Sequence, residues 1–333
     1  MKFVVLIVSA VILQFSTQAN EAESIREWAA IESLVQERGF NGSIVIAKGE
    51  QVLFHQNFGY ADAAASIPLT SKHVFSPGSV GKEFTTISMM QLAASNKLTY
   101  QDKITDYIDG LPAWASEITI EHVLTHTSGL PAVQWKKHIS TADAVQQIQQ
   151  GQPVFEPGAG YHYTNLNVVV RALIVERITG KSYSDSVVDT IFKVAGMTDS
   201  FHQTDRQPAA NTVVAGDFPT HMAGLTIYVT PLDLYKFERA LWNGSLVKAE
   251  QLRQVLEGDR LSGQQNRAYF DFGRFMLDQD GTLLSWEHDG SNPSHHTIKH
   301  HDFITGSIVV LMSSDGNKST LYQLLHAIQA VKL

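Results

Sequence analysis

Ser79 and Lys82 are placed so that one side chain can activate the other. They stand three residues apart, at the start of a run whose apolar residues recur every three or four positions, which predicts a helix with one buried face. Pro77 and Gly78 stop any earlier helix, so Ser79 is expected at or just inside the first turn. Side chains three apart lie on one helix face, which brings the Lys82 amine to the Ser79 hydroxyl. A buried lysine whose pKa falls toward neutrality can then serve as the base that makes serine a nucleophile.

The Ser-x-x-Lys spacing does not establish this chemistry by itself. A chain of this length contains it by chance about once or twice. The alternative is an N-capping serine followed by a solvated lysine. If a helix does begin here, its N-terminus adds free N–H groups where an oxyanion forms. The prediction therefore depends on residues further along the chain.

Tyr163 and Asn165 form a second candidate group. They follow a loop over residues 155–162 that is shaped by proline and glycine and that leads into an apolar helix. Two residues apart in an extended loop, the phenol and the amide point the same way. Tyr163 can relay a proton to or from a leaving group, and Asn165 can hold a substrate amide. The alternative is a core tyrosine beside a helix-capping asparagine.

His288, Gly290 and Ser291 form a third group, placed just after a strand predicted over residues 282–286. Gly290 at a strand end lets a substrate approach the backbone. The Ser291 N–H can join that of Ser79 as a second oxyanion donor. His288 is expected to face a substrate carboxylate or to assist proton transfer. The alternative is a turn with a surface histidine.

Composition narrows the class of protein. The chain has 333 residues, 44% of them hydrophobic, and a formal net charge of −8, so it can bury a large core and is not expected to bind nucleic acid. Dinucleotide and P-loop fingerprints are absent from the sequence. The sequence has no cysteine, which rules out a thiol nucleophile, disulfides and thiolate metal sites.

Residues 1–19 are typical of a secretory signal. Lys2 supplies the positive end, residues 3–13 the apolar core, and residues 16–19 a small-residue cleavage site. We therefore expect export to a bacterial periplasm or to the outside, with no membrane span left after cleavage. The alternative is that this segment remains as an anchor.

Strand patterns lie near both ends of the chain and helical patterns between them. This order predicts an α/β (α+β) fold, in which an antiparallel sheet built from both chain ends is flanked by helices and carries an inserted, mainly helical domain. We place the sheet domain at residues 20–95 and 223–333, and the insertion at 96–222. Helices are expected at 21–38, 119–124, 141–149, 167–178, 184–194, 232–241 and 321–331, and strands at 43–48, 51–56, 268–277, 282–286, 295–299 and 307–312.

Taken in order, S-x-x-K, Y-x-N and H-x-G resemble the motifs of the serine β-lactamase and penicillin-binding-protein superfamily, in particular its class C-like branch. Three further segments are similar to stretches of that family: residues 123–131 (VLTHTSGLP), residues 155–165 and residues 223–233. The likeness runs from about Phe40 to the C-terminus and is specific as a set.

The resemblance implies a reaction. Ser79 would be acylated by an amide or ester carbonyl, with Lys82 and Tyr163 sharing the base and acid roles. Asn165 would hold the substrate, and the N–H groups of Ser79 and Ser291 would form the oxyanion hole. Water would then release the acyl group. The resemblance implies no metal and no cofactor.

Two departures from the family pattern bear on the substrate. His288 stands where lactamases of this branch carry lysine, and H-x-G is similar to some D,D-peptidases, D-aminopeptidases and esterases. Asp289 puts an acidic group where a substrate carboxylate would lie. We therefore expect D-amino-acid peptides, including peptidoglycan fragments, or small esters as substrates, with β-lactams as the alternative.

The sequence speaks against two other classes of function. A non-catalytic penicillin-recognising sensor has no chemical need for Ser79, Lys82 and Tyr163 together. A metal site would have to use the C-terminal histidines, but no zinc-like spacing to Asp or Glu accompanies them, and a histidine-rich surface hairpin is the expected alternative. These histidines are His288, His295, His296, His300 and His301. The lipase-type G-x-S-x-G elbow is absent from the sequence.

Overall fold

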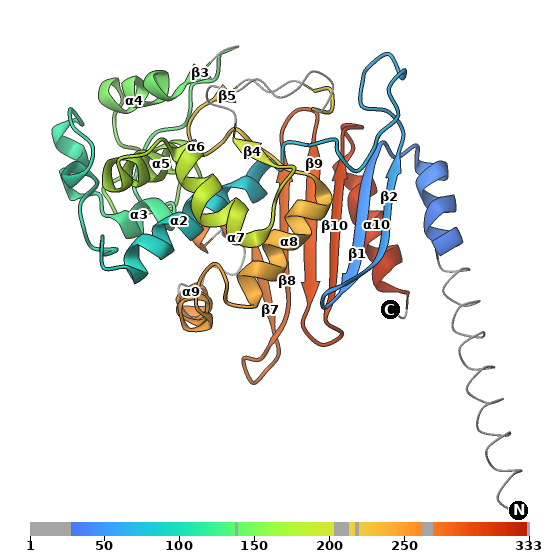
Figure 1. The fold of residues 1–333 in the computed structure, drawn as a ribbon. Helices are drawn as coiled ribbons and strands as arrows, with labels where there is room; N and C mark the ends of the chain where they lie inside the picture. Colours follow the sequence, from blue (N-terminus) through green and yellow to red (C-terminus); the bar gives the residue numbers. More distant parts are fainter. Residues whose placement is uncertain (1–27, 137–138, 203–212, 217–219, 262–268, 332–333) are drawn as a thin grey trace, which may run out of the picture.

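Both ends of the chain build one sheet. The computed structural model describes residues 28–136, 139–202, 213–216, 220–261 and 269–331. The six strands of this sheet are antiparallel throughout and lie in the order β2-β1-β10-β9-β8-β7 (Figure 1). The strands are β1 (Gly42–Lys48), β2 (Gln51–Phe58), β7 (Arg274–Leu277), β8 (Leu283–Ser291), β9 (His296–Asp302) and β10 (Ser307–Ser313). The pairing of β1 with β10 confirms the predicted sheet.

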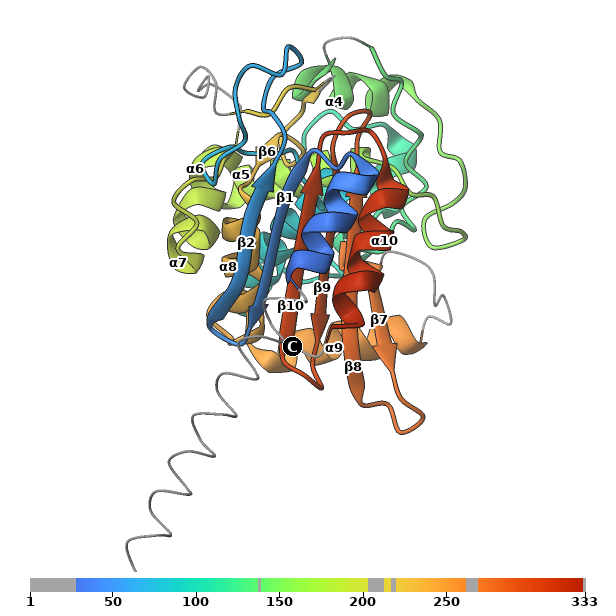
Figure 2. The ribbon, with the colours of Figure 1, turned by 90° about the vertical axis from the view of Figure 1, so that its right-hand side faces the viewer.

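Helices cover both faces of this sheet. A helix over residues 28–38 and α10 (Lys318–Gln329) lie on one face, while α8 (Pro231–Trp242) and the helices from the middle of the chain lie on the other (Figures 1 and 2). Strand β1 therefore sends Ile44 and Ile46 into one buried cluster and Val45 and Ala47 into the other. Because both of its faces are buried, β1 is an unbroken apolar run rather than an alternating one.

The middle of the chain is helical, as predicted. Helix α5 (Leu166–Thr179) is buried along most of its length, and α2 (Lys82–Ala94) packs against it. Thr119 and Thr230 accept backbone N–H bonds as the N-caps of α3 (Ile120–Leu124) and α8. The remaining elements here are η2 (Ile104–Asp106), η3 (Ala113–Glu117), β3 (Ile139–Ser140), α4 (Thr141–Gln150), α6 (Tyr183–Val187), the π-helical η4 (Val188–Phe192), α7 (Lys193–Ala195), β4 (Phe201–His202), β5 (Thr220–His221) and β6 (Ile227–Tyr228).

The structure corrects two of the predicted elements and adds a helix. Strand β8 continues to Ser291, because its last residues stay paired with β9, so the third group lies within the strand and not after it. The strand expected over 268–277 begins only at Arg274 and follows η5 (Tyr269–Asp271), a short 3-10 turn. Helix α9 (Ala249–Leu261) was not predicted.

Some predictions fall outside the described residues. The signal segment at 1–19 and the start of the helix predicted at 21–38 are among them. Of the helices that the structure describes, none combines the length and the apolar character that a bilayer crossing requires. The domain boundaries at 95/96 and 222/223 stay a prediction.

Candidate active site

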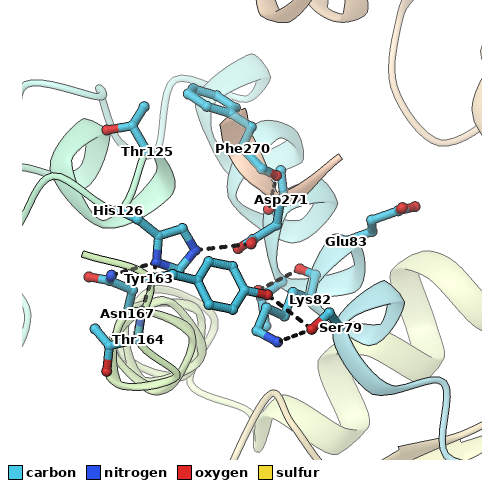
Figure 3. Close-up of polar contacts among 12 residues, drawn as sticks. Ser79, Lys82, Glu83, Thr125, His126, Tyr163, Thr164, Asn167, Phe270 and Asp271 are labelled. Atoms are coloured by element: carbon cyan, nitrogen blue, oxygen red, sulfur yellow. Dashed lines mark hydrogen bonds and ion pairs between the residues drawn. The ribbon is translucent and has the colours of Figure 1, made fainter. Parts of the chain in front are cut away.

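Ser79 and Lys82 meet across a 3-10 turn. Ser79 lies in η1 (Gly78–Gly81) and Lys82 is the first residue of α2, so the predicted first helical turn is of the tighter kind. In a 3-10 turn, residues three apart eclipse one another, which brings the two side chains directly into line. The Lys82 Nζ donates to Ser79 Oγ at 3.0 Å (Figure 3).

Lys82 is buried, with 4% of its surface exposed. Burial lowers the pKa of its amine to about 8; the Asp271 carboxylate opposes this shift and the Arg171 guanidinium adds to it. A substantial fraction of Lys82 is therefore the free amine in mildly alkaline solution, and the free amine is the form that can remove a proton from Ser79.

Tyr163 provides the second donor to the serine. Its hydroxyl donates to Ser79 Oγ at 3.0 Å, and Lys82 Nζ lies 5.0 Å from the centre of its ring. The residue is 40% exposed, but its hydroxyl end is turned inward to Ser79. Burial of this end and the nearby Asp271 carboxylate raise the pKa of Tyr163 above its ordinary value. The phenol therefore keeps its proton under conditions in which Lys82 can lose one.

Asn165 lies beside them with an unused acceptor. It occupies the N-cap position of α5, yet its side chain makes no capping hydrogen bond. Its Oδ1 is buried and has no partner among the described residues. A buried carbonyl oxygen without a partner is costly, so it is well suited to accept a substrate N–H.

These side chains line one pocket of about 530 Å³. Aromatic and aliphatic side chains form much of its wall, and Lys82 is its one charged residue within the described part of the chain. The pocket lies between η1 and the end of β8 on one side and the loop before α5 on the other. Its remaining lining residues are Ser76, Gly78, Trp135, Leu225, Thr226, Tyr228, Ser291, Asn292 and Pro293.

Gly290 brings β8 against the turn that carries Ser79. A Cβ at this position would lie 2.1 Å from the Pro77 carbonyl oxygen and 2.7 Å from the Ser79 nitrogen. The sequence prediction expected a substrate to make this close approach, but the backbone of the nucleophile's own turn makes it. The contact sets Ser291 beside Ser79, where two N–H groups can face one oxyanion.

We expect Gly290→Ala to lower the acylation rate at least about a hundredfold, because the added methyl must push the Ser79 turn out of line. Gly81→Ala in the same turn is the matched control. Gly81 has a right-handed φ of −61°, and its new methyl would meet only the Pro77 ring at 3.3 Å. Acylation rates followed by intact-protein mass would test the pair; equal rates in the two variants would refute the packing argument.

His288 does not face the pocket, so its predicted role is wrong. It is 5% exposed and bonds to Glu83 of α2. His288 and Gly290 lie on the same face of β8, which packs against η1 and which meets α2 through the bond from His288 to Glu83. Asp289 points to the other face, where Lys318 and Tyr322 of α10 hold it. Asp289 therefore does not stand in the way of a substrate carboxylate, contrary to the expectation.

The other C-terminal histidines are not a surface hairpin either. Exposure is 0% at His295, 9% at His296 and 7% at His300. Each has a hydrogen-bond partner: His295 bonds the backbone at Ser76, His296 the Ser291 hydroxyl and His300 the Gln329 side chain. Across the described ranges, no three His, Asp or Glu side chains are arranged to share a metal ion.

The sequence prediction missed a set of buried charged residues behind the site. His126 lies in the 123–131 segment but was given no role, although it contacts the Tyr163 ring. Arg171 lies inside the apolar helix α5, where a buried charge requires a partner, and this was the available signal. Its partner, Asp271, is 100 residues away and carried no recognisable signal.

Three features define the class of protein: a sheet assembled from both chain ends, helices inserted between its strands, and a serine hydroxyl that accepts from a lysine and a tyrosine. These are the features of the β-lactamase and penicillin-binding-protein fold. The chain belongs to the Beta-lactamase family, whose family model matches residues 29–331.

Known proteins and structures agree with this placement. The chain is 27% identical over 304 residues to Penicillin-binding protein 4* of Bacillus subtilis (strain 168), covering 80% of this chain and 66%, just under two thirds, of that protein. A penicillin-binding protein from Bacillus halodurans has a TM-score of 0.77 at 22% identity, over 90% of this chain and 99% of that one. The D-amino acid amidase from Ochrobactrum anthropi SV3 has a TM-score of 0.74 at 24% identity, over 91% and 98%. At these identities the two structures show the fold alone.

Proposed function

We propose that this protein is an exported hydrolase that forms an acyl-enzyme on Ser79 and cleaves amide or ester bonds in D-amino-acid peptides, related amides or small esters. The observation that carries the proposal is the double hydrogen bond to Ser79 Oγ, from a buried lysine and from a tyrosine. The signal-like pattern of residues 1–19 supports export.

The proposed acylation uses Lys82 as the base. Its free amine takes the Ser79 proton as Oγ bonds to the substrate carbonyl carbon, and the N–H groups of Ser79 and Ser291 stabilise the oxyanion. When the tetrahedral intermediate collapses, Tyr163 gives its proton to the leaving nitrogen or oxygen and recovers one from protonated Lys82. Water then attacks the acyl carbonyl, and the same groups return Ser79 to its hydroxyl form.

The pocket supports a neutral acyl donor. Trp135, Leu225 and Tyr228 offer apolar surface, and Asn165 offers an amide oxygen to a substrate N–H. His288, which was expected to meet a carboxylate, is buried between β8 and α2, where it bonds Glu83. These features favour N-acylated D-amino-acid esters and amides over substrates that need a second cation. The existence of a D-amino acid amidase with this fold is consistent with the proposal.

The test is an acylation profile from pH 6 to pH 10, measured by intact-protein mass with an aryl ester of N-acetyl-D-alanine and, separately, with benzylpenicillin. We expect an adduct whose formation rate rises with pH through about 8 and then levels off, because Lys82 must lose its proton to act as the base. Below that point the rate should fall about tenfold per pH unit, as for one titrating group.

The two substrates separate the candidate functions. Fast ester turnover with a slow or absent penicillin adduct supports the proposal. A penicillin adduct that hydrolyses within seconds supports the β-lactamase alternative. Stable labelling by penicillin without turnover of any ester or amide supports a sensor. Acylation that is independent of pH over the whole range would contradict the role of Lys82.

A further inference from the structure

A buried ion pair lies behind the Ser79 cluster without lining the pocket. Arg171 of α5 pairs with Asp271 of η5, and both side chains are fully buried. Arg171 also donates to the Thr86 hydroxyl of α2 at 3.0 Å, so the pair ties the helix that begins at Lys82 to α5 and η5. Well-packed apolar side chains of similar volume often serve stability as well as a buried ion pair does. Stability alone therefore does not explain why this position holds an ion pair, and we consider a functional role.

Both ring nitrogens of His126 have a defined partner, and Asp271 accepts from one of them. The Leu130 N–H donates to Ser128 Oγ, so the Ser128 hydroxyl hydrogen goes to Asn167 Oδ1 at 2.7 Å. The Asn167 amide must then donate to His126 Nδ1 at 2.8 Å. With Nδ1 accepting, the ring proton sits on Nε2, which donates to Asp271 Oδ1 at 3.0 Å. Burial lowers the pKa of His126 despite the nearby carboxylate, which keeps the ring neutral in this tautomer.

His126 in turn holds Tyr163. The two ring centres are 4.4 Å apart, and the planes are inclined by 32°. His126 also bonds the backbone on both sides of the tyrosine: its carbonyl accepts the His162 N–H at 2.9 Å, and its Nδ1 accepts the Thr164 N–H at 3.3 Å. Figure 3 shows the resulting path from Asp271 through His126 and Tyr163 to Ser79.

The backbone is strained to make these contacts. His126, Phe270 and Asp271 have φ values of +56°, +53° and +57°, in the left-handed region that non-glycine residues rarely adopt. Two of the three are consecutive, and all three are buried. Such conformations persist where the surroundings determine them, and they gather at functional sites.

We propose that Asp271, held by Arg171, is a positioning residue for acylation: by accepting from Nε2 it orients the His126 ring on which Tyr163 rests. Neither Asp271 nor Arg171 lines the pocket, so neither touches the substrate. This inference rests on the proposed acylation of Ser79.

The charges of the pair also bear on the base. The groups that face Lys82 are Tyr163 from the loop before α5, His126 from the segment after α3, Asp271 from η5 and Arg171 from α5. Asp271 raises the pKa of Lys82 and Arg171 lowers it. Removing either charge alone should therefore shift the midpoint of the pH profile of acylation, and the two shifts should be opposite in sign.

The experiment compares wild type, Asp271→Asn, Arg171→Met and the double variant in the acylation profile described above. We expect Asp271→Asn to lower the plateau rate about 10- to 100-fold, the usual range when the hydrogen-bond partner of a functional side chain is lost. Its midpoint should move to lower pH, that of Arg171→Met to higher pH, and that of the double variant back toward wild type. Arg171→Lys, which keeps the charge, should keep the wild-type midpoint.

Glu238→Gln is the matched control, since it removes a buried charge from a separate cluster that does not touch Tyr163. It should lower the melting temperature without moving the midpoint. Shifts of the same sign in Asp271→Asn and Arg171→Met, unchanged profiles, or the same shift in Glu238→Gln would overturn the inference. If Asp271→Asn does not fold, Arg171→Lys and Arg171→Met still supply the charge comparison.

The outcomes for wild type separate this inference from the proposed function. A wild-type protein that forms no Ser79 adduct overturns both. If wild type is acylated as expected and the variants keep its plateau rate and its midpoint pH, the positioning role alone is overturned. An independent readout is the imidazole nitrogen spectrum of His126, which should show the Nε2–H tautomer in wild type and a shifted Nε2 signal in Asp271→Asn, where the acceptor has lost its charge.

Discussion

Ser79→Ala is expected to abolish acylation, lowering the hydrolysis rate by about 10⁴- to 10⁶-fold while the protein stays folded. Losses of this size follow the removal of a catalytic nucleophile, because the remaining groups provide only binding and oxyanion stabilisation. Here the lost oxygen is also the shared acceptor of Lys82 and Tyr163, so the variant leaves Lys82 with no serine proton to remove.

The measurement is intact-protein mass after reaction with the aryl ester, together with the turnover rate and a thermal melt. Ser95→Ala is the control, since Ser95 is exposed at the far end of α2 and its hydroxyl bonds only the Gln91 carbonyl. The control should acylate at the wild-type rate. An adduct of the same mass on Ser79→Ala would show that another residue is the nucleophile.

Lys299→Met is expected to cost about 3–5 kcal/mol of folding free energy, the usual penalty for removing one partner of a buried ion pair. Lys299 is 2% exposed and donates to Glu83 at 2.7 Å and to Glu238 at 2.6 Å. Its ammonium also lies 3.9 Å from the centre of the Trp286 ring. Methionine fills much of the space but leaves two buried carboxylates without their shared cation.

Thermal and urea unfolding measure this loss. For a chain of this size the melting temperature should fall by about 5–10 °C. Lys193→Met is the control: Lys193 bonds Asp189 at 2.6 Å, but its side chain is 68% exposed, so the expected change is within about 0.5 kcal/mol. Equal losses in the two variants would contradict the argument from burial.

The pH dependence separates charge from packing. In wild type, burial alone would raise the pKa of Glu238, but Lys299 and His301 outweigh it and hold the pKa at about 2. Stability from this depressed pKa is present above the unfolded value of 4.5 and is lost as pH falls toward 2. Lys299→Met lacks this contribution, so the gap between variant and wild type should narrow from about pH 6 to pH 3. A gap that does not change with pH would indicate lost packing instead.

Local spacing predicted the nucleophile pair correctly as neighbours. Ser79 and Lys82 are three residues apart, and any helical turn brings side chains at that spacing together, so the contact needs no tertiary information. The N-caps Thr119 and Thr230 were predictable for the same reason, since a cap bonds the backbone three residues on. Only the kind of turn at Ser79, 3-10 rather than α, came from the fold.

Strand positions were harder, because one residue decides which face a side chain takes. The sequence indicated a strand near Trp286 but not that pairing with β9 would carry it to Ser291. That extension turns His288 onto Glu83 and away from the pocket, and it uses Gly290 to admit the Ser79 turn. The sequence analysis singled out His288, Gly290 and Ser291 but did not predict which way the strand turns them.

The sequence by itself therefore determined the family, the sheet shared by both chain ends and the candidate residues Ser79, Lys82 and Tyr163, because these depend on local patterns and on motif order. Only the tertiary structure decided which charges meet behind the site. Asp271 reaches Arg171 across 100 residues and Lys299 reaches Glu83 across 216. Buried charges are stable only with a partner, and no local pattern can say where in the chain that partner lies.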